Sequence, residues 1–171
     1  MAAPSPWVHG VGLQVEGLGV LLRGAPGVGK STLALELLAR GHRLIADDVV
    51  QLDAAADGAP LLRPARPPLA GFLHSRALGW IEVPRLFGAA ALAAEAPLGL
   101  LLCLTADPAA TADPLPWPGP LPAERVLVTG LGHNLALLVE LAVRLEQLRR
   151  AGHDPAADFA HRQAQALATR S

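Results

Sequence analysis

Residues 24–31 restrict the fold of this chain more than any other stretch, because their sequence matches a phosphate-binding P-loop. They read Gly-Ala-Pro-Gly-Val-Gly-Lys-Ser, which matches the pattern G-x-x-x-x-G-K-[ST]. In such a loop, backbone N–H groups turn inward around phosphate oxygens, and glycine permits the backbone angles that this requires. The lysine reaches the β- and γ-phosphates, and the serine hydroxyl binds Mg²⁺. The motif predicts ATP and Mg²⁺ as cofactors, with ATP held by Gly24, Ala25, Pro26, Gly27, Val28, Gly29, Lys30, Ser31 and Thr32.

The segments on both sides of the motif fit a P-loop. Residues 19–23 form a short apolar run of strand length, and residues 31–40 are good helix formers that stop at Gly41. The helix would point the positive end of its dipole at the bound anion. Lys30 is also the single lysine among the 14 lysine and arginine residues. Strand, loop and helix therefore occur in the order that the motif requires.

Asp47 and Asp48 form the second candidate feature. They follow an apolar run at residues 43–46, which we expect to be the strand after the P-loop helix, so that strand, helix and strand form a βαβ-like unit. Because that strand ends immediately before the pair, we expect both carboxylates to reach the nucleotide. One would hold Mg²⁺, and its neighbour would accept the proton of an attacking hydroxyl. The alternative is an ordinary turn with solvated aspartates.

The remaining pattern predicts an α/β fold, a mixed sheet flanked by helices, in a single domain over residues 1–171. A helix should begin at Asn134 and end at Gly152, and a terminal helix should occupy residues 154–171. Residues 105–125 should form a proline-rich loop. Further strands are expected at residues 7–14, 49–52, 78–83, 98–105 and 126–129, with a loop or edge strand at 61–73.

Composition narrows the class of protein. The formal net charge is −1, so no basic field indicates nucleic acid or an anionic membrane. Apolar runs are interrupted before they reach membrane-spanning length, and residues 1–10 lack the pattern of a signal peptide. The single Cys103 lies in an apolar run and is expected to be a buried thiol. We therefore expect a cytoplasmic protein.

The region from Trp7 to Asp53 resembles the catalytic domain of the HPr kinase/phosphorylase family. The resemblance rests on His9-Gly10, the P-loop with its flanks, and the run Arg40-Gly-His-Arg-Leu-Ile-Ala-Asp-Asp48. Residues 71–79 weakly resemble the family segment L-L-E-I-R-G-L-G. Residues 132–136 and the helix after them resemble the family's R-P-G-R-N-L-A stretch. The chain thus resembles a compact form without the N-terminal domain of full-length members.

This resemblance implies ATP-dependent phosphorylation of a serine on the phosphocarrier protein HPr, by a P-loop α/β domain that assembles as a hexamer. His9, Lys30, Asp47, Asp48 and Arg76 would be the catalytic residues. The metal ligands would be Ser31 and Asp47, and Asp48 is preferred as the base.

Two departures from the family pattern affect the function that we expect. His74 stands at the position of a family glutamate, although Mg²⁺ prefers oxygen ligands, and Ala77 replaces a glycine. The arginine of the reverse phosphorylase reaction has no clear counterpart, Arg125 being the candidate, so the kinase reaction is the stronger expectation. The alternatives are a P-loop kinase for another hydroxyl acceptor and a non-catalytic module that senses ATP.

Overall fold

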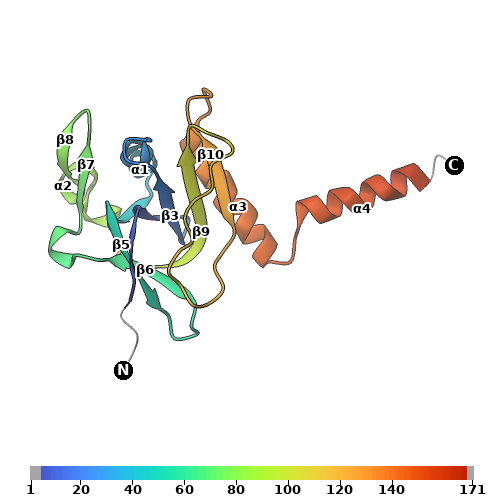
Figure 1. The fold of residues 1–171 in the computed structure, drawn as a ribbon, viewed down its shortest axis with the longest axis horizontal. Helices are drawn as coiled ribbons and strands as arrows, with labels where there is room; N and C mark the ends of the chain where they lie inside the picture. The colour runs from blue at the N-terminus through green and yellow to red at the C-terminus, as the bar shows by residue number, and fades with distance from the viewer. Residues whose placement is uncertain (1–4, 169–171) are drawn as a thin grey trace.

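A mixed β-sheet with the P-loop strand near its middle forms the frame of the protein. The computed structural model describes residues 5–168, and within them the strand order is β1-β5-β6-β9-β3-β2-β4, with β10 also paired to β9 (Figure 1). The strands are β1 (Trp7–His9), β2 (Val11–Val15), β3 (Leu18–Gly24), β4 (Arg43–Ala46), β5 (Val49–Ala54), β6 (Pro60–Pro64), β9 (Ala96–Thr105) and β10 (Glu124–Val128).

The predicted strand, loop and helix around the P-loop are confirmed. Strand β3 leads through the loop into α1 (Lys30–Ala39), which ends at Arg40 and Gly41. However, β3 and β4 are not neighbours, since β2 lies between them and is antiparallel to both. The expected βαβ-like unit therefore has a third strand inserted in its middle. On its other side β3 pairs in parallel with β9, the central strand predicted from residues 98–105.

The single strand predicted over residues 7–14 is wrong in one respect, because it is broken at Gly10. Strand β1 pairs with β5, whereas β2 pairs with β3 and β4. At the break, the Gly10 N–H donates to the Asp48 carbonyl oxygen at 2.9 Å. The break thus joins the first strands to the turn that carries the aspartates.

Residues 61–73 differ from the predicted loop or edge strand. Strand β6 lies inside the strand order, between β5 and β9, but it pairs with β9 only through Leu61 and Leu62. Because proline N–H groups are missing at both ends of β6, a short internal strand tolerates them. A 3₁₀ turn (Pro67–Leu69) follows, and then a separate two-stranded hairpin of β7 (Phe72–Ser75) and β8 (Gly79–Glu82). The chain continues through α2 (Val83–Phe87) and a second 3₁₀ turn (Ala89–Ala91).

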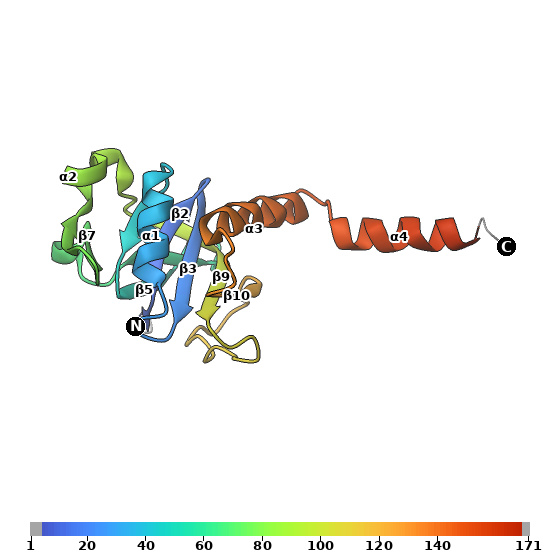
Figure 2. The ribbon, with the colours of Figure 1, turned by 90° about the horizontal axis from the view of Figure 1, so that it is seen from above.

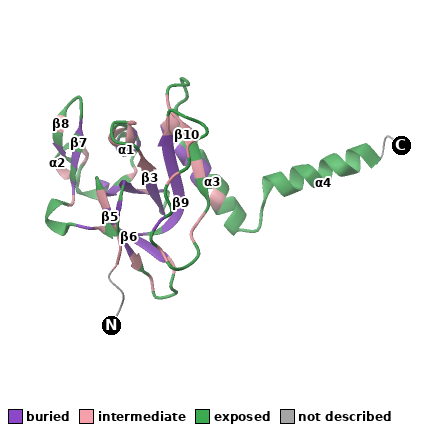
Figure 3. Ribbon diagram, in the orientation of Figure 1, coloured by how far each residue is buried: buried purple, intermediate pink, exposed green. Residues whose placement is uncertain are grey.

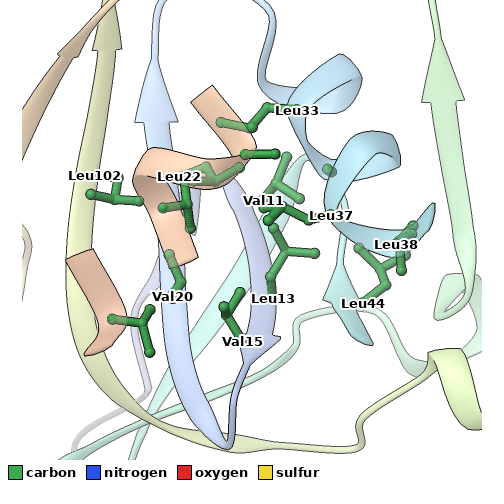
Figure 4. Packing of buried hydrophobic residues seen from close by; sticks show 14 of the residues in the cluster. Val11, Leu13, Val15, Val20, Leu22, Leu33, Leu37, Leu38, Leu44 and Leu102 are labelled. Atoms are coloured by element: carbon green, nitrogen blue, oxygen red, sulfur yellow. The ribbon is translucent and has the colours of Figure 1, made fainter. Parts of the chain in front are cut away.

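Two apolar clusters fix the sheet. One joins β2, β3 and β9 to α1, α3 (Leu135–Arg150) and the hairpin, and Figure 4 shows Leu33, Leu37 and Leu38 of α1 over the side chains of β2 and β3. The other cluster contains no helix. It packs β5, β6 and the opposite face of β9 against Leu115 of the proline-rich loop, residues 106–123. The flanking helices α1 and α3 thus cover one face of the sheet.

A buried carboxylate ties α1 to α3. Glu140 is 7% exposed and accepts hydrogen bonds from Arg40 Nε and Nη2 at 2.8 and 2.6 Å. Its Oε1 atom also lies 2.8 Å from His42 Nε2. These contacts lower the pKa of Glu140 to about 2, with the Arg40 hydrogen bonds as the largest cause. Glu140 therefore anchors the turn that joins the P-loop helix to β4.

The C-terminal region holds the two helices predicted there. The Asn134 side chain caps α3 by accepting from the Leu137 N–H at 3.0 Å. Helix α4 (Pro155–Ala168) has no buried residue and extends away from the sheet (Figures 1, 2 and 3). The predicted terminal helix reached Ser171, and residues 169–171 lie outside the described part of the chain. No helix in that part is long and apolar enough to cross a membrane.

Candidate active site

The P-loop lies between the end of β3 and the first turn of α1. Gly24 has φ 140°, and a Cβ there would lie 2.3 Å from the Leu104 carbonyl oxygen, so only glycine fits against β9. Gly29 is the N-cap residue of α1, and its carbonyl oxygen accepts from the Leu33 N–H at 3.0 Å. Thr32 is exposed in the first helical turn. The predicted nucleotide-binding residues are therefore contiguous at the positive end of a helix dipole.

Lys30 points back over its own loop. Its Nζ atom donates to the carbonyl oxygens of Gly24 and Ala25 at 2.8 and 3.0 Å. Partial burial lowers the pKa of Lys30, and the nearby charges of Asp48 and Asp47 oppose this effect. The ammonium group thus sits between the loop and both predicted carboxylates.

Asp47 is half-buried and held from two sides. Its Oδ2 atom accepts the backbone N–H of His74 at 2.9 Å, and its Oδ1 atom lies 3.4 Å from Ser31 Oγ, which donates to it. Burial is the largest influence and raises the pKa of Asp47, while these hydrogen bonds oppose it. When burial raises the pKa of a carboxyl group, a nearby cation stabilises its charged form.

Asp48 occupies a tight turn and faces solvent. Its φ is 68°, which is uncommon for a residue other than glycine. The Asp47 carbonyl oxygen accepts from the Val49 N–H at 2.8 Å, so Asp48 is the middle residue of a γ-turn. Its side chain is 81% exposed, and its Oδ1 atom lies 3.9 Å from Nδ1 of His9. Adjacent in sequence, Asp47 and Asp48 therefore differ sharply in environment.

Arg76 and His74 reach the site from the hairpin. A Cβ placed on Gly27 would lie 2.7 Å from Arg76 Nη2, so the guanidinium packs directly on the P-loop. The imidazole of His74 contacts the Trp80 ring edge-on, with a centroid separation of 4.9 Å. His74 therefore supports Asp47 through its backbone, while its side chain is directed to an aromatic neighbour. Arg125, the phosphorylase candidate, lies on β10 with a buried Nε atom that has no hydrogen-bond partner among the described residues.

One pocket of about 700 Å³ brings these groups together. It is lined by Lys30, Ser31, Asp47 and Asp48. Its lining also includes residues that the sequence did not single out, namely Arg66, Leu69, Phe72 and Trp80. Period-two alternation would have placed Phe72 and Trp80 on the same face as His74, since all three occupy outward positions of the hairpin.

A second pocket, of about 810 Å³, borders the other side of the P-loop. It is lined by Gly24 to Val28, by Arg23 and by the start of the proline-rich loop. His9 lies at this pocket, so it stands where the two pockets meet beside Asp48. The P-loop therefore has open space on both sides.

The donor set near the P-loop is suited to Mg²⁺. Among residues 5–168, no three His, Cys, Asp or Glu side chains are grouped to hold a metal by themselves. Mg²⁺ in nucleotide sites is bound by one or two protein oxygens together with phosphates and water. Ser31 Oγ and Asp47 Oδ1, 3.4 Å apart, provide such a pair of oxygens.

Comparisons with known proteins agree on one family. The family model of the HPr Serine kinase C-terminal domain matches residues 1–116. The chain is 38% identical to HPr kinase/phosphorylase of Bordetella petrii over 178 residues, covering 96% of this chain and 56% of that protein. It is 39% identical to HPr kinase/phosphorylase of Burkholderia cenocepacia, over 96% of this chain and 53% of that protein. The chain thus spans about half the length of these curated relatives.

A solved structure is also similar. The Hpr(Ser) kinase/phosphatase from Coxiella burnetii aligns with a TM-score of 0.75 and 29% identity, covering 90% of this chain and 98% of that chain. The P-loop kinase type of α/β fold expected from the sequence is therefore confirmed. Sequence and structure together show that the chain belongs to the HPr kinase family, within its C-terminal domain.

Proposed function

We propose that the protein is an ATP-dependent serine kinase whose acceptor is HPr or an HPr-like phosphocarrier protein. The observation that carries this proposal is the pocket lined by both Lys30 and Ser31 of the P-loop and by Asp47 and Asp48. Membership of the HPr kinase family supports the choice of acceptor, since the relatives are named HPr kinase/phosphorylase.

Lys30 and the P-loop backbone would hold the β- and γ-phosphates. Ser31 and Asp47 would hold Mg²⁺, because Asp47 is the more buried aspartate and is fixed by Ser31 and the His74 N–H. Bound Mg²⁺ supplies neutralisation of phosphate charge. Arg76 stands against Gly27, from where its guanidinium can contact phosphate oxygens that develop charge during transfer.

Asp48 would accept the proton from the acceptor serine. Its carboxylate is exposed, it lines the pocket together with Lys30, and its Oδ1 atom lies 3.9 Å from Nδ1 of His9. The γ-turn fixes where that carboxylate points, because its backbone is held by the bond between Val49 N–H and Asp47 O. His9 would stabilise and orient the Asp48 carboxylate from the side of the second pocket. We place the phosphorylase reaction second, because Arg125 does not line either described pocket.

The test uses Asp48→Asn, with Asp57→Asn as its control. Asparagine tolerates a positive φ as aspartate does, so the γ-turn should persist. We expect Asp48→Asn to lower kcat for transfer to HPr by about 10²-fold or more while ATP affinity stays within ~2-fold. Asp57 lies in the exposed turn before β6, and its replacement should leave kcat unchanged. Lys30→Ala should abolish detectable ATP binding.

The outcomes separate the competing functions. Wild type that transfers phosphate to a metabolite but not to HPr would make the protein a kinase for another acceptor. Wild type that binds ATP and transfers phosphate to no acceptor would favour the sensor function. An unchanged kcat in Asp48→Asn, with active wild type, would exclude Asp48 as the base.

We also propose that the protein self-associates, as the hexamer implied by family resemblance requires. Helix α4 has no buried residue, although Phe159 is 67% and Leu167 is 64% exposed. Helix α3 also exposes leucines on the face turned away from the sheet, at Leu138, Leu141, Leu145 and Leu148. Their spacing of three and four residues is typical of helix pairing. Light scattering coupled to size exclusion should give a mass well above the 17.7 kDa of one chain.

A further inference from the structure

The outward face of the β7–β8 hairpin carries two large exposed apolar side chains, which is unusual for a two-stranded sheet beside solvent. Leu73 and Ile81 pair across the strands and are buried in the core. The opposite face would therefore be expected to carry polar residues. His74 and Glu82 do lie there, but they are paired with Trp80, which is 73% exposed, and with Phe72, which is 40% exposed.

Two further side chains extend this apolar face. Leu69, 55% exposed, lies in the 3₁₀ turn before β7, and Leu78, 71% exposed, lies in the turn between β7 and β8. We call Leu69, Phe72, Leu78 and Trp80 the hairpin face. Figures 1 and 3 show the hairpin beside α1, on the side of the molecule away from β10, with exposed positions along it.

The hairpin face is continuous with the pocket that holds the aspartates. Leu69, Phe72 and Trp80 line that pocket together with Lys30 and Asp48, whereas Leu78 does not line it. In phosphoryl transfer the attacking and leaving oxygens lie roughly in line, on opposite sides of the γ-phosphate. An acceptor hydroxyl at Asp48 therefore enters through this pocket, and the nucleoside extends to the other side of the P-loop, where the second pocket lies.

We propose that the hairpin face is the docking surface for the protein acceptor, with Trp80 as its anchor. The inference rests on the proposed kinase function and names the surface that recognises the phosphocarrier. The partner presents its acceptor serine beside a small apolar patch that covers Leu78 and Trp80. Exposed aromatic residues such as Trp80 provide much of the binding energy when a partner excludes water from them.

Size favours a protein over a small metabolite. A molecule contained in a pocket of about 700 Å³ would leave Leu78 uncovered, since Leu78 does not line the pocket. Charge complements the apolar contact, because Arg66 and Arg76 are both exposed next to the hairpin face. The matching surface of the phosphocarrier should therefore carry at least one carboxylate near its apolar patch.

The test measures steady-state phosphorylation of HPr by Trp80→Ala, Leu78→Ala and the control Leu131→Ala. Leu131 is 61% exposed and follows β10 of the main sheet, whereas the hairpin forms a separate two-stranded sheet. We expect Trp80→Ala to raise KM for HPr by roughly 10- to 30-fold and Leu78→Ala by about 3-fold or more. Leu131→Ala should stay within ~2-fold, and ATP affinity measured without HPr should be the same in all variants.

The possible outcomes distinguish failure of the docking surface from failure of the proposed kinase function. Active wild type with an unchanged KM for HPr in both hairpin variants overturns the docking surface and leaves the kinase function standing. Weaker ATP binding in Trp80→Ala without HPr would assign this pocket to the nucleoside and also overturn the proposal. No transfer from wild type to HPr defeats the proposed function itself, together with its docking surface.

Discussion

Replacing Glu140 with glutamine tests how strongly a buried charge fixes the P-loop helix. The change keeps the size of the side chain and removes the charge that Arg40 and His42 contact. A carboxyl whose pKa falls from 4.5 to about 2 on folding contributes roughly 3 kcal/mol at pH 7, at about 1.4 kcal/mol per pKa unit. For a chain of this length, that loss corresponds to a lower Tm by roughly 6–12 °C.

The stabilisation by Glu140 must decrease as the pH falls. Because the folded-state pKa lies below the unfolded-state value of 4.5, the stabilisation is present above that value and is lost as pH falls through about 2. At pH 3 it should already have dropped to roughly 1 kcal/mol. The difference between wild type and Glu140→Gln should therefore shrink by about 2 kcal/mol from pH 7 to pH 3.

Urea unfolding followed by circular dichroism at pH 7, 5 and 3 measures this difference. Glu82→Gln is the matched control, since Glu82 forms an exposed pair with Arg85 at 2.7 Å and its loss should cost no more than about 0.5 kcal/mol. A difference that is equal at pH 7 and pH 3 would show that the charge of Glu140 is not what stabilises the junction. A difference below about 1 kcal/mol at pH 7 would lead to the same conclusion.

Two substitutions and one labelling experiment test the packing of the P-loop and of β9. Gly27→Ala should lower ATP affinity at least ~10-fold in calorimetry, because the new Cβ would push against Arg76 at 2.7 Å where φ is +79°; normal affinity would mean that the loop adapts freely. Gly99→Ala should destabilise the fold by roughly 1–3 kcal/mol in urea, since its Cβ would lie 2.2 Å from Leu18 Cγ, and an unchanged midpoint would contradict this close packing. Burial raises the pKa of the Cys103 thiol, so a disulfide reagent should label it slowly at pH 8 in folded protein and rapidly in urea; equal rates would show that the thiol is accessible.

The sequence was sufficient for the P-loop and its immediate surroundings because their signals are local. The glycine and lysine spacing, the helix formers after Ser31 and the stop at Gly41 act within a few residues of one another. The proximity of Asp47 to Ser31 could also be predicted from the sequence, because the strand after the P-loop helix ends at the same edge of the sheet.

What the sequence did not disclose depends on contacts between distant residues. The break at Gly10 reflects its bond to the Asp48 carbonyl oxygen, and the position of β6 inside the sheet is set by pairing with β9. The outer wall of the pocket was also missed, because Trp80 reads as a hydrophobic strand residue until its pairing with His74 places it on the outward face. The difference between Asp47 and Asp48 could not be resolved without the γ-turn.

The hydrogen bond from the His74 backbone N–H to Asp47 connects the proposed docking surface on the β7–β8 hairpin to the proposed magnesium site. The strand that presents Phe72 on one face also positions a proposed magnesium ligand through its main chain. A shift of β7 on docking of the phosphocarrier would move that carboxylate with it. If binding of the phosphocarrier moved the Asp47 carboxylate into a better position for magnesium, it would increase the affinity for magnesium. Because coupled binding equilibria are reciprocal, magnesium would then increase the affinity for the phosphocarrier by the same factor.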